Sequence, residues 1–376
     1  MAEWVECTIG DLCETISDTY KGNDEKVILV NTSDILEGKV LNHIEVQNKN
    51  LKGQFKKTFR KNDILFSEIR PANKRFAFID FEDTSNYIAS TKLMVLRHNE
   101  KVLPEYLFAI LKSNYILAEL QHLAETRSGT FPQITFTSEL APMKVNLPDK
   151  KTQKRIVSIL SSIEQKIDVN ETVNNNLEQQ VSILYQSWFE DFEITNGVCP
   201  EDWSYQELSS IADIASGKRP LVKSNVCNQE TPISIVGAAS VMGFTSEANH
   251  TDKILVTGRV GTHGVVQRFN TPCWTSDNTL VITSPYYEFT NQILHRIDYS
   301  SMNRGSTQPL ITQGDIKKVV VLVPDENTLA KFEEFAGSLM VKWEANNKEN
   351  IKLASLRDTL LPKLMSGELD VSDIEL

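Results

Sequence analysis

The fold is decided by one stretch, residues 148–188, which reads PDKKTQKRIVSILSSIEQKIDVNETVNNNLEQQVSILYQSW. Its apolar residues recur at alternating steps of four and three, the a and d spacing of a heptad repeat. The positions concerned are Ile156, Leu160, Ile163, Ile167, Asn170, Asn174, Leu177, Val181, Leu184 and Trp188. The spacing predicts one helix of about 44 residues, or ~65 Å. It begins after Pro148, where Asp149 can accept from the first backbone N–H groups.

The same pattern returns 176 residues later in the chain. It runs through Phe332, Ala336, Leu339, Trp343, Asn346, Asn350, Leu353, Arg357, Leu360 and Leu364. The two asparagines again interrupt the seam. Asparagines at a seam lower stability but can fix the register, because their side chains pair in only one alignment. We therefore expect two antiparallel helices whose Asn layers meet near the middle. The alternative is that the asparagines are exposed where the helices bend or fray. Pro362 is expected to end or kink the second helix.

A similar globular segment precedes each helix, so the chain is duplicated. The residues Thr130, Pro132, Ile134 and Thr135 recur as Thr307, Pro309, Ile311 and Thr312, and Pro148-Asp149 recurs as Pro324-Asp325. Trp4 and Trp203 begin the two copies. The apolar spacing that follows each Trp (Ile9, Leu12, Ile16 and Leu208, Ile211, Ala215) predicts a short amphipathic helix. Another helix is expected from Pro104 to about Glu125. Strands are expected at residues 27–30, 64–67, 89–96 and 144–147, and at 233–236, 254–257, 275–282 and 318–323.

The expected fold class is therefore α+β. It consists of two globular α/β domains separated by an antiparallel two-helix coiled coil, with pseudo-twofold symmetry. We expect globular domains at residues 1–148 and 196–323, a central long helix at 149–195, and a C-terminal long helix and tail at 324–376. A protein built in this way suits a target with two half-sites better than it suits a single catalytic pocket.

The net charge of −11 is unusual for a protein that binds a polyanion. Residues 149–195 carry five basic and eight acidic side chains, and residues 324–376 carry six and eleven. These two helical segments therefore account for eight of the eleven net negative charges. The globular segments are nearly neutral, and each can present a basic face.

Composition also limits the compartment and the chemistry. No run approaches the ~20 apolar residues needed to cross a bilayer, so a cytoplasmic protein with no membrane partner is expected. The five cysteines, which are Cys7, Cys13, Cys199, Cys227 and Cys273, include no CxxC pair and are expected to be free thiols. Neither a metal nor a cofactor is expected.

The chain resembles the specificity (S) subunits of type I restriction-modification systems along its whole length. The resemblance rests on the duplicated layout and on three stretches of sequence. These are Ser306-Thr307-Gln308-Pro309-Leu310-Ile311-Thr312, Leu147-Pro148 running into Gln153-Lys154-Arg155-Ile156-Val157, and Leu360-Leu361-Pro362-Lys363-Leu364-Met365-Ser366-Gly367-Glu368-Leu369.

This resemblance implies two target-recognition domains, each reading one half of a bipartite double-stranded DNA site. It implies a coiled coil that sets the spacing and docks two methyltransferase (M) subunits, which carry S-adenosylmethionine and the DNA methylation chemistry. Restriction (R) subunits join in the full complex. The S subunit itself is not catalytic.

Candidate DNA-binding residues fall in three pairs of segments. Basic clusters early in each domain are Lys56, Lys57 and Arg60, and Lys218, Arg219 and Lys223. The loop after a central strand carries Arg70, Lys74 and Arg75 in the first copy, and Arg259 and His263 in the second. The loop before the closing strand carries Arg127 and Thr130, and Arg304, Thr307 and Gln308. Side chains of these types suit contacts with phosphate or base edges. The alternatives are solvated basic faces and structural turns.

Two catalytic classes of protein are disfavoured. A metal-dependent nuclease has one supporting string, in which Asp149 precedes Glu164-Gln165-Lys166, but its carboxylates would lie ~22 Å apart along one helix. A methyltransferase is disfavoured because Ser284-Pro285-Tyr286-Tyr287 lacks a second proline and no Gly-rich cofactor loop opens a βαβ unit. A coiled-coil scaffold without a DNA role stays open.

Overall fold

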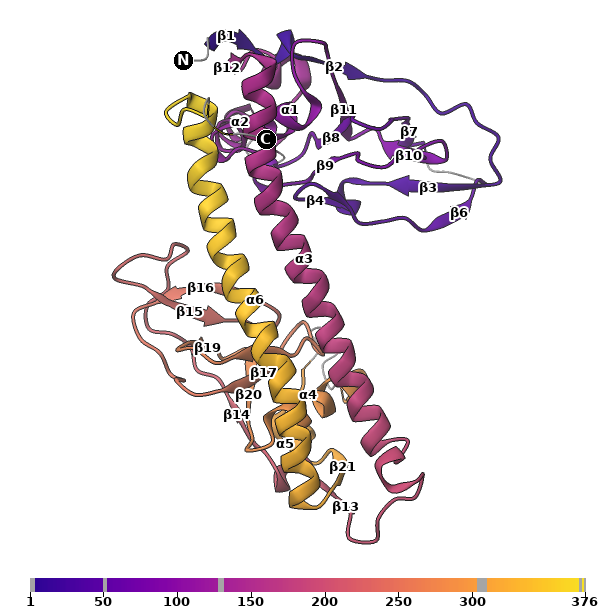
Figure 1. Ribbon diagram of the computed structural model, residues 1–376, viewed down its shortest axis with the longest axis vertical. Helices are drawn as coiled ribbons and strands as arrows, with labels where there is room; N and C mark the ends of the chain where they lie inside the picture. Colours follow the sequence, from indigo (N-terminus) through magenta and orange to yellow (C-terminus); the bar gives the residue numbers. More distant parts are fainter. Residues whose placement is uncertain (1–3, 50–52, 128–131, 303–309, 372–373, 375–376) are drawn as a thin grey trace. The chain divides into compact units, whose positions relative to one another are not determined.

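The computed structural model describes residues 4–49, 53–127, 132–302, 310–371 and 374. The chain divides into two compact units (Figure 1). Unit 1 comprises residues 1–169 and 349–376, and unit 2 comprises residues 170–348. Each unit includes part of both long helices. The four-part division expected from the sequence stays a prediction.

Unit 1 is built from short strands that form two four-stranded sheets and two small ones. The sheet orders are β2-β11-β8-β9, β6-β3-β10-β7, β1-β12 and β4-β5. The strands are β1 (Trp4–Thr8), β2 (Cys13–Ile16), β3 (Lys26–Val30), β4 (Ile35–Leu36), β5 (Lys39–Val40), β6 (Glu45–Gln47), β7 (Phe55–Lys57), β8 (Ile64–Ser67), β9 (Phe76–Phe78), β10 (Tyr87–Ser90), β11 (Leu93–His98) and β12 (Lys144–Pro148). Two helices, α1 (Pro104–Leu111) and α2 (Asn114–Arg127), complete the globular part.

Unit 2 repeats this plan. Its sheet orders are β14-β20-β17-β18, β16-β15-β19 and β13-β21, and in both units a three- or four-stranded sheet contains one parallel pair. The elements are β13 (Ser204–Glu207), β14 (Asp213–Ser216), β15 (Ile233–Val236), β16 (Val241–Thr245), β17 (Ile254–Gly258), β18 (Gln267–Phe269), β19 (Trp274–Thr275), β20 (Thr279–Thr283), β21 (Val320–Val323), α4 (Tyr287–Arg296) and α5 (Gln313–Lys317). The expected α+β class and the duplication are confirmed.

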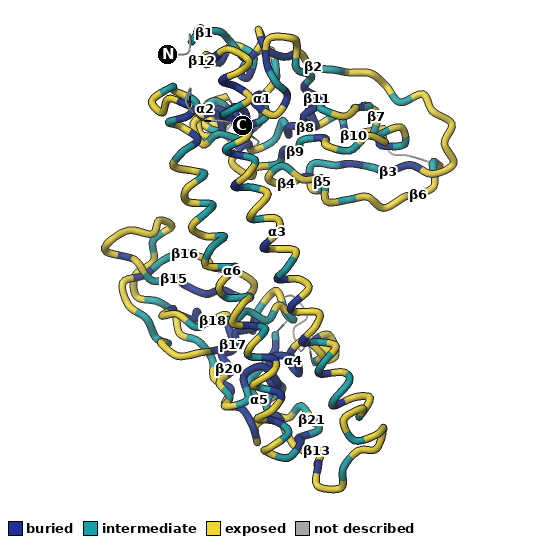
Figure 2. The backbone as a smooth tube through the Cα atoms, viewed as in Figure 1, coloured by how far each residue is buried: buried dark blue, intermediate teal, exposed yellow. Residues whose placement is uncertain are grey.

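The two long helices are α3 (Lys150–Phe189) and α6 (Glu326–Ser366). In unit 1 the first turns of α3 share a buried cluster with the last turns of α6, through Ile156, Leu160, Leu361 and Leu364. In unit 2 the last turns of α3 share a cluster with the first turns of α6, through Val181, Tyr185, Phe189, Phe332, Ala336 and Met340. The helices therefore pair antiparallel in both units, as the sequence predicted. None of the twenty predicted seam positions is exposed, and the exposed residues lie on the other faces (Figure 2).

The start of α3 is also as predicted. Asp149 accepts hydrogen bonds from the backbone N–H of Thr152 at 2.9 Å and from its hydroxyl at 3.1 Å. These bonds hold the pKa of the Asp149 carboxyl below its ordinary value. A charge at this end complements the helix dipole.

Two local predictions were wrong, and a third was wrong in part. The segments after Trp4 and Trp203 do not form amphipathic helices. Each is a strand, a 3-10 turn (Ile9–Asp11, Leu208–Ser210) and a second strand, because β1 pairs with β12 and β13 pairs with β21. The helix predicted from Pro104 breaks between α1 and α2. Pro362 lies inside α6, which continues to Ser366, so the helix does not end there, and the expected kink at Pro362 stays a prediction.

Within the described residues, no helix has the length and apolar character that a bilayer-spanning segment requires. The five cysteines have free thiols, as expected.

Candidate nucleic-acid interface

The loop after β8 in unit 1 lies beside the segment that precedes the closing strand. The backbone N–H of Ile134 donates to the carbonyl of Glu68 at 2.9 Å, and that of Arg70 donates to the carbonyl of Pro132 at 3.2 Å. Residue Ile69 forms an isolated antiparallel bridge with Gln133. The fold therefore brings together two of the segments that the sequence singled out separately.

Unit 2 builds the same frame at the end of β17. The N–H of Ile311 donates to the carbonyl of Arg259 at 3.0 Å, and Val260 forms a bridge with Leu310. Because Ile134 and Ile311 are equivalent in the repeat, Glu68 and Arg259 occupy equivalent places. A second pair of bonds agrees, since the N–H of Glu68 donates to the carbonyl of Lys92 and that of Arg259 to the carbonyl of Asn278. One backbone frame thus presents opposite charges in the two units.

The three basic residues of the first loop have different surroundings. Arg70 is exposed, and in the described chain its guanidinium has no ion-pair partner. Lys74 forms an ion pair of 2.9 Å with Glu37. Arg75 donates two 3.1 Å bonds to the carbonyls of Ser33 and Ile35, so it is committed to holding the fold. Both Arg70 and Lys74 have positive φ, +46° and +53°, which fixes an unusual turn at this edge.

A fourth basic side chain comes from β7 and lies beside the start of this loop, where Leu93 pairs with Ser67. The Lys57 ammonium donates to the carbonyl of Leu93 at 2.7 Å, and burial lowers the pKa of Lys57 below its ordinary value. The Glu68 carboxylate raises that pKa and the Lys92 ammonium lowers it. Lys92 itself lies 3.9 Å from the Glu68 carboxylate. Sequence reasoning missed Lys92, because only the pairing of β11 with β8 places it there.

Lys56 and Arg60, the other members of the early cluster, are exposed. The backbone N–H of Arg60 donates to Asp63 at 2.8 Å, and Asp63 is buried in a two-bond ion pair with Arg97. The carboxylate bonds raise the pKa of Arg97. This pair fixes the turn ahead of β8 and leaves the Arg60 side chain at the surface.

Arg127, at the end of α2, forms an ion pair of 2.9 Å with Glu139. The same carboxylate accepts from the N–H of Thr135 at 2.6 Å and from its hydroxyl at 2.9 Å. The predicted residues Thr130, Arg304, Thr307 and Gln308 lie outside the described residues.

In unit 2, Arg259 and His263 lie on the loop between β17 and β18. Arg259 is half-buried and has no side-chain partner in the described chain. His263 Nδ1 lies 3.2 Å from the carbonyl of Gly258, whereas its buried Nε2 has no partner among the described groups. His263 therefore shapes the loop from within. Lys218, Arg219 and Lys223 are all exposed on the loop after β14.

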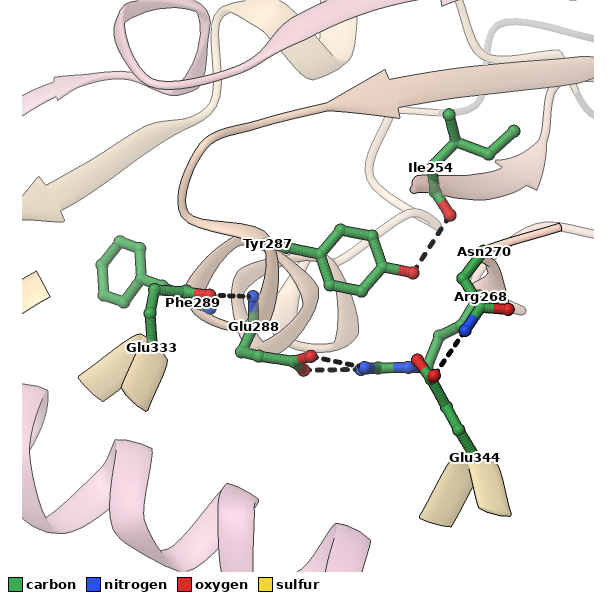
Figure 3. Close-up of polar contacts among 8 residues, drawn as sticks. All are labelled: Ile254, Arg268, Asn270, Tyr287, Glu288, Phe289, Glu333 and Glu344. Atoms are coloured by element: carbon green, nitrogen blue, oxygen red, sulfur yellow. Dashed lines mark hydrogen bonds and ion pairs between the residues drawn. The ribbon is translucent and has the colours of Figure 1, made fainter. Parts of the chain in front are cut away.

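A buried polar network holds β18 behind this loop, and no pattern in the sequence predicts it (Figure 3). Arg268 on β18 forms two bonds of 2.7 and 2.6 Å with Glu288 on α4. Its guanidinium lies 5.0 Å from the ring centre of Tyr287 and 5.7 Å from that of Trp343 on α6. Asn270 bonds to Glu344, also on α6. The network joins the strand after the loop to the long helix.

Glu333 attaches α4 to α6 in the same network (Figure 3). Its carboxylate accepts from the backbone N–H groups of Glu288 at 3.0 Å and Phe289 at 2.8 Å, at the N-terminus of α4. The side chain of Tyr286, the residue before α4, does not cap this helix, and the Glu333 carboxylate caps it from α6. Burial raises the pKa of Glu333 to about 7.

Asn174 and Asn346 face one another in unit 2. The Nδ2 of Asn346 donates to Oδ1 of Asn174 at 2.9 Å, and Nδ2 of Asn174 donates to Asn347 Oδ1 at 3.1 Å. Both are buried, as is Asn170, whereas Asn350 is partly exposed. None of the four seam asparagines is fully exposed, so the alternative in which they are exposed at a bend is wrong.

The residues of the nuclease string are occupied by structural contacts. Asp149 caps α3, and Glu164 forms an ion pair with Lys112. Within the described residues no group of three or more His, Cys, Asp or Glu side chains could hold a metal ion.

Comparison with known proteins agrees with this architecture. Residues 1–179 match the family model of the type I restriction modification DNA specificity domain. The type I restriction enzyme HindI specificity subunit of Haemophilus influenzae is 29% identical, over 98% of this chain and 100% of the relative. The MjaIX specificity subunit of Methanocaldococcus jannaschii is 24% identical, over 73% of this chain and 71% of the relative.

A solved structure shows the same fold. The crystal structure of the type I restriction-modification S subunit from M. genitalium matches with a TM-score of 0.55 at 16% identity, covering 99% of this chain and 97% of that one. The fold is therefore that of a type I specificity subunit. Residues 1–179 carry the type I DNA specificity domain, and the resemblance of the chain to type I restriction-modification specificity subunits is confirmed.

Proposed function

We propose that this chain is the sequence-specific DNA-recognition subunit of a type I restriction-modification complex. Each globular part reads one half of a bipartite duplex site, and the paired helices set the spacing. One observation carries the proposal: the two units build the same backbone frame at Glu68 and Arg259 but place opposite charges there. A duplicated frame with divergent side chains is what a protein needs to read two different half-sites.

We propose a set of DNA-facing residues in each unit. In unit 1 they are Lys56, Lys57, Arg60, Arg70 and Lys74 with Lys92, and in unit 2 they are Arg259, Lys218, Arg219 and Lys223. Arg75, Arg127 and His263 act mainly through internal contacts that hold the loops. Thr130, Arg304, Thr307 and Gln308 stay candidate DNA-binding residues on the sequence alone.

The long helices are the docking surface for the partner proteins. Val169, Ile183, Phe335, Val341 and Ile351 are each more than half exposed on these helices, although water disfavours large apolar side chains. We infer that they pack against two methyltransferase subunits, with restriction subunits joining indirectly. The chain contributes recognition and no catalytic group, and it acts in the cytoplasm, where cellular DNA is accessible.

Exchange of residues 196–323 for those of a relative tests the division of labour. Methylome sequencing of the host should then show one half of the methylated site altered, with the other half and the spacing retained. Changes in both halves would refute the assignment. If the chain and its methyltransferase protect no sequence in footprinting on random duplexes, the helices serve only as a protein scaffold. Robust plasmid cleavage by the purified chain with Mg²⁺ would instead favour a nuclease.

A further inference from the structure

The loop of residues 219–223 in unit 2 is anchored at both ends. At its start, the N–H of Lys218 donates to the carbonyl of Thr275 at 2.9 Å, and the indole of Trp274 donates to the carbonyl of Lys218 at 2.7 Å. At its end, Ser224 and Phe244 exchange two backbone bonds of 2.8 Å. The five residues between these anchors are therefore held in a defined position.

Two glycines allow the base of this loop to close tightly. A Cβ at Gly217 would lie 2.1 Å from the carbonyl oxygen of Ser276, which is far inside contact distance. A Cβ at Gly243, where φ is +150°, would lie 2.8 Å from the carbonyl oxygen of Ser224. The backbone beneath the loop is thus closely packed, and this gives the loop a rigid support.

The tip of the loop exposes apolar side chains. Leu221 is 96% exposed and Val222 is 48% exposed, and Val226, just beyond the second anchor, is 64% exposed. Val241 and Met242, also exposed, lie on β16, the strand that continues to Phe244. A single exposed leucine is ordinary, but two apolar residues on an anchored loop, with further exposed apolar residues in the segments paired at its end, indicate a contact surface.

Positive charge surrounds this apolar tip. Lys218, Arg219 and Lys223 are exposed, and no acidic residue occurs between positions 214 and 229, in a chain whose net charge is −11. In the part of the chain that the structure describes, these three cations form no ion pair. Charge complementarity therefore favours a polyanion as the occupant.

We propose that Leu221 is a wedge that enters between two base pairs from the minor groove of the half-site bound by unit 2. Lys218, Arg219 and Lys223 would hold the phosphates on either side. Apolar wedges flanked by cations unstack base steps and bend the duplex in proteins that bind the minor groove. The loop after β2 in unit 1 carries three acidic residues (Asp18, Asp24 and Glu25) against one cation (Lys21) and no aliphatic side chain, so only one half-site would be deformed. This inference rests on the proposed DNA recognition.

The test uses the full chain with its methyltransferase subunit and a duplex that carries the methylated site. 2-Aminopurine is placed in turn at each base position of the half-site that unit 2 binds. That half-site is identified as the one that changes when residues 196–323 are exchanged. In the wild-type complex one position should brighten severalfold because its base is unstacked. Leu221→Ala should abolish this signal and weaken binding about tenfold, whereas Leu221→Met should retain both.

Two controls separate the possible outcomes. Because Leu221 is 96% exposed, Leu221→Ala should leave thermal unfolding unchanged. A variant with Lys218, Arg219 and Lys223 all changed to Ala should lower the slope of log K against log salt by about three. Specific binding with no bright position, or Leu221→Ala binding like wild type, would overturn the wedge and leave the proposed function standing. If the Leu221→Ala protein no longer binds the methyltransferase subunit in the absence of DNA, the wedge proposal is also overturned. Absence of any specific binding by wild type would instead refute the proposed function.

Discussion

Asn346 donates a 2.9 Å hydrogen bond to Asn174 between the antiparallel helices of unit 2, and both side chains are buried. Asn174 also donates to the carbonyl of Trp343 at 3.3 Å and to Asn347. These amides are satisfied only in one alignment of the helices. The bond therefore fixes the register of the pair at the cost of apolar packing.

A single substitution at this pair should destabilise unit 2. Asn346→Leu leaves the amide of Asn174 buried with fewer partners, and we expect a loss of about 1–3 kcal/mol in the free energy of unfolding. The double variant Asn174→Leu/Asn346→Leu should lose less than the sum of the two single variants, because both polar groups are gone. Urea unfolding measures this. Additive losses would show that the two residues do not depend on one another.

The register also defines a matched deletion. In both units a residue of α3 faces the residue of α6 for which the two residue numbers sum to about 520, as Asn174 and Asn346 do. Residues 163–169 therefore lie opposite residues 351–357. Deleting both segments removes ~10 Å of helix and should shorten the preferred gap between half-sites by about 3 base pairs. Methylome sequencing should show unchanged half-sites. Deleting one segment alone is the control, and it should unfold the protein by placing apolar seam positions opposite polar ones.

The Arg268–Glu288 pair should be costly to break. Both side chains are less than a tenth exposed, so Arg268→Met leaves a carboxylate buried without its partner, with an expected loss of about 3–5 kcal/mol. The double variant Arg268→Met/Glu288→Leu should recover much of that loss. The matched control is Lys144→Ala, which breaks the exposed pair with Glu6 and should leave the free energy of unfolding nearly unchanged. A small effect of Arg268→Met would mean that water reaches Glu288.

Glu333 should make the stability of unit 2 depend on pH. Burial raises its folded pKa to about 7, above the ordinary value of 4.5, so the folded state binds the proton more tightly than the unfolded state. The associated stability is complete below about pH 4.5 and is lost as pH rises to about 7, by at most about 3 kcal/mol. The difference in unfolding free energy between wild type and Glu333→Gln isolates this contribution. A difference that is constant between pH 4.5 and 7 would show that the pKa of Glu333 is ordinary.

Arg70 should contribute to DNA affinity without choosing the sequence. Its exposed guanidinium suits a phosphate, so Arg70→Ala should weaken binding about fivefold to tenfold and lower the salt slope by about one. Lys144→Ala, a surface charge on β12 that is paired with Glu6, should leave binding unchanged. If Arg70→Ala changes the selected sequence instead, Arg70 contacts a base edge.

Much of this protein is determined by local sequence. The heptad spacing predicts long helices, because it places apolar residues such as Leu160 and Leu339 in one stripe along each helix. That stripe is buried when the two helices pack together. The positions of Asn174 and Asn346 in that stripe determine the antiparallel alignment. Strands such as β15 followed equally well from short β-branched runs bounded by turn residues.

Other features depend on residues that are far apart in the chain. The spacing of Ile9, Leu12 and Ile16 is compatible with an amphipathic helix. The segment is nevertheless extended, because β1 pairs with β12, which lies about 140 residues later in the chain. The equivalence of Glu68 and Arg259, the approach of Lys92 and the Arg268–Glu288 pair likewise arise from strand register and packing. Periodicity is a property of neighbouring residues and decides which elements form. Hydrogen bonding and the burial of charge between distant segments decide which side chains meet, and these are fixed only in the tertiary structure.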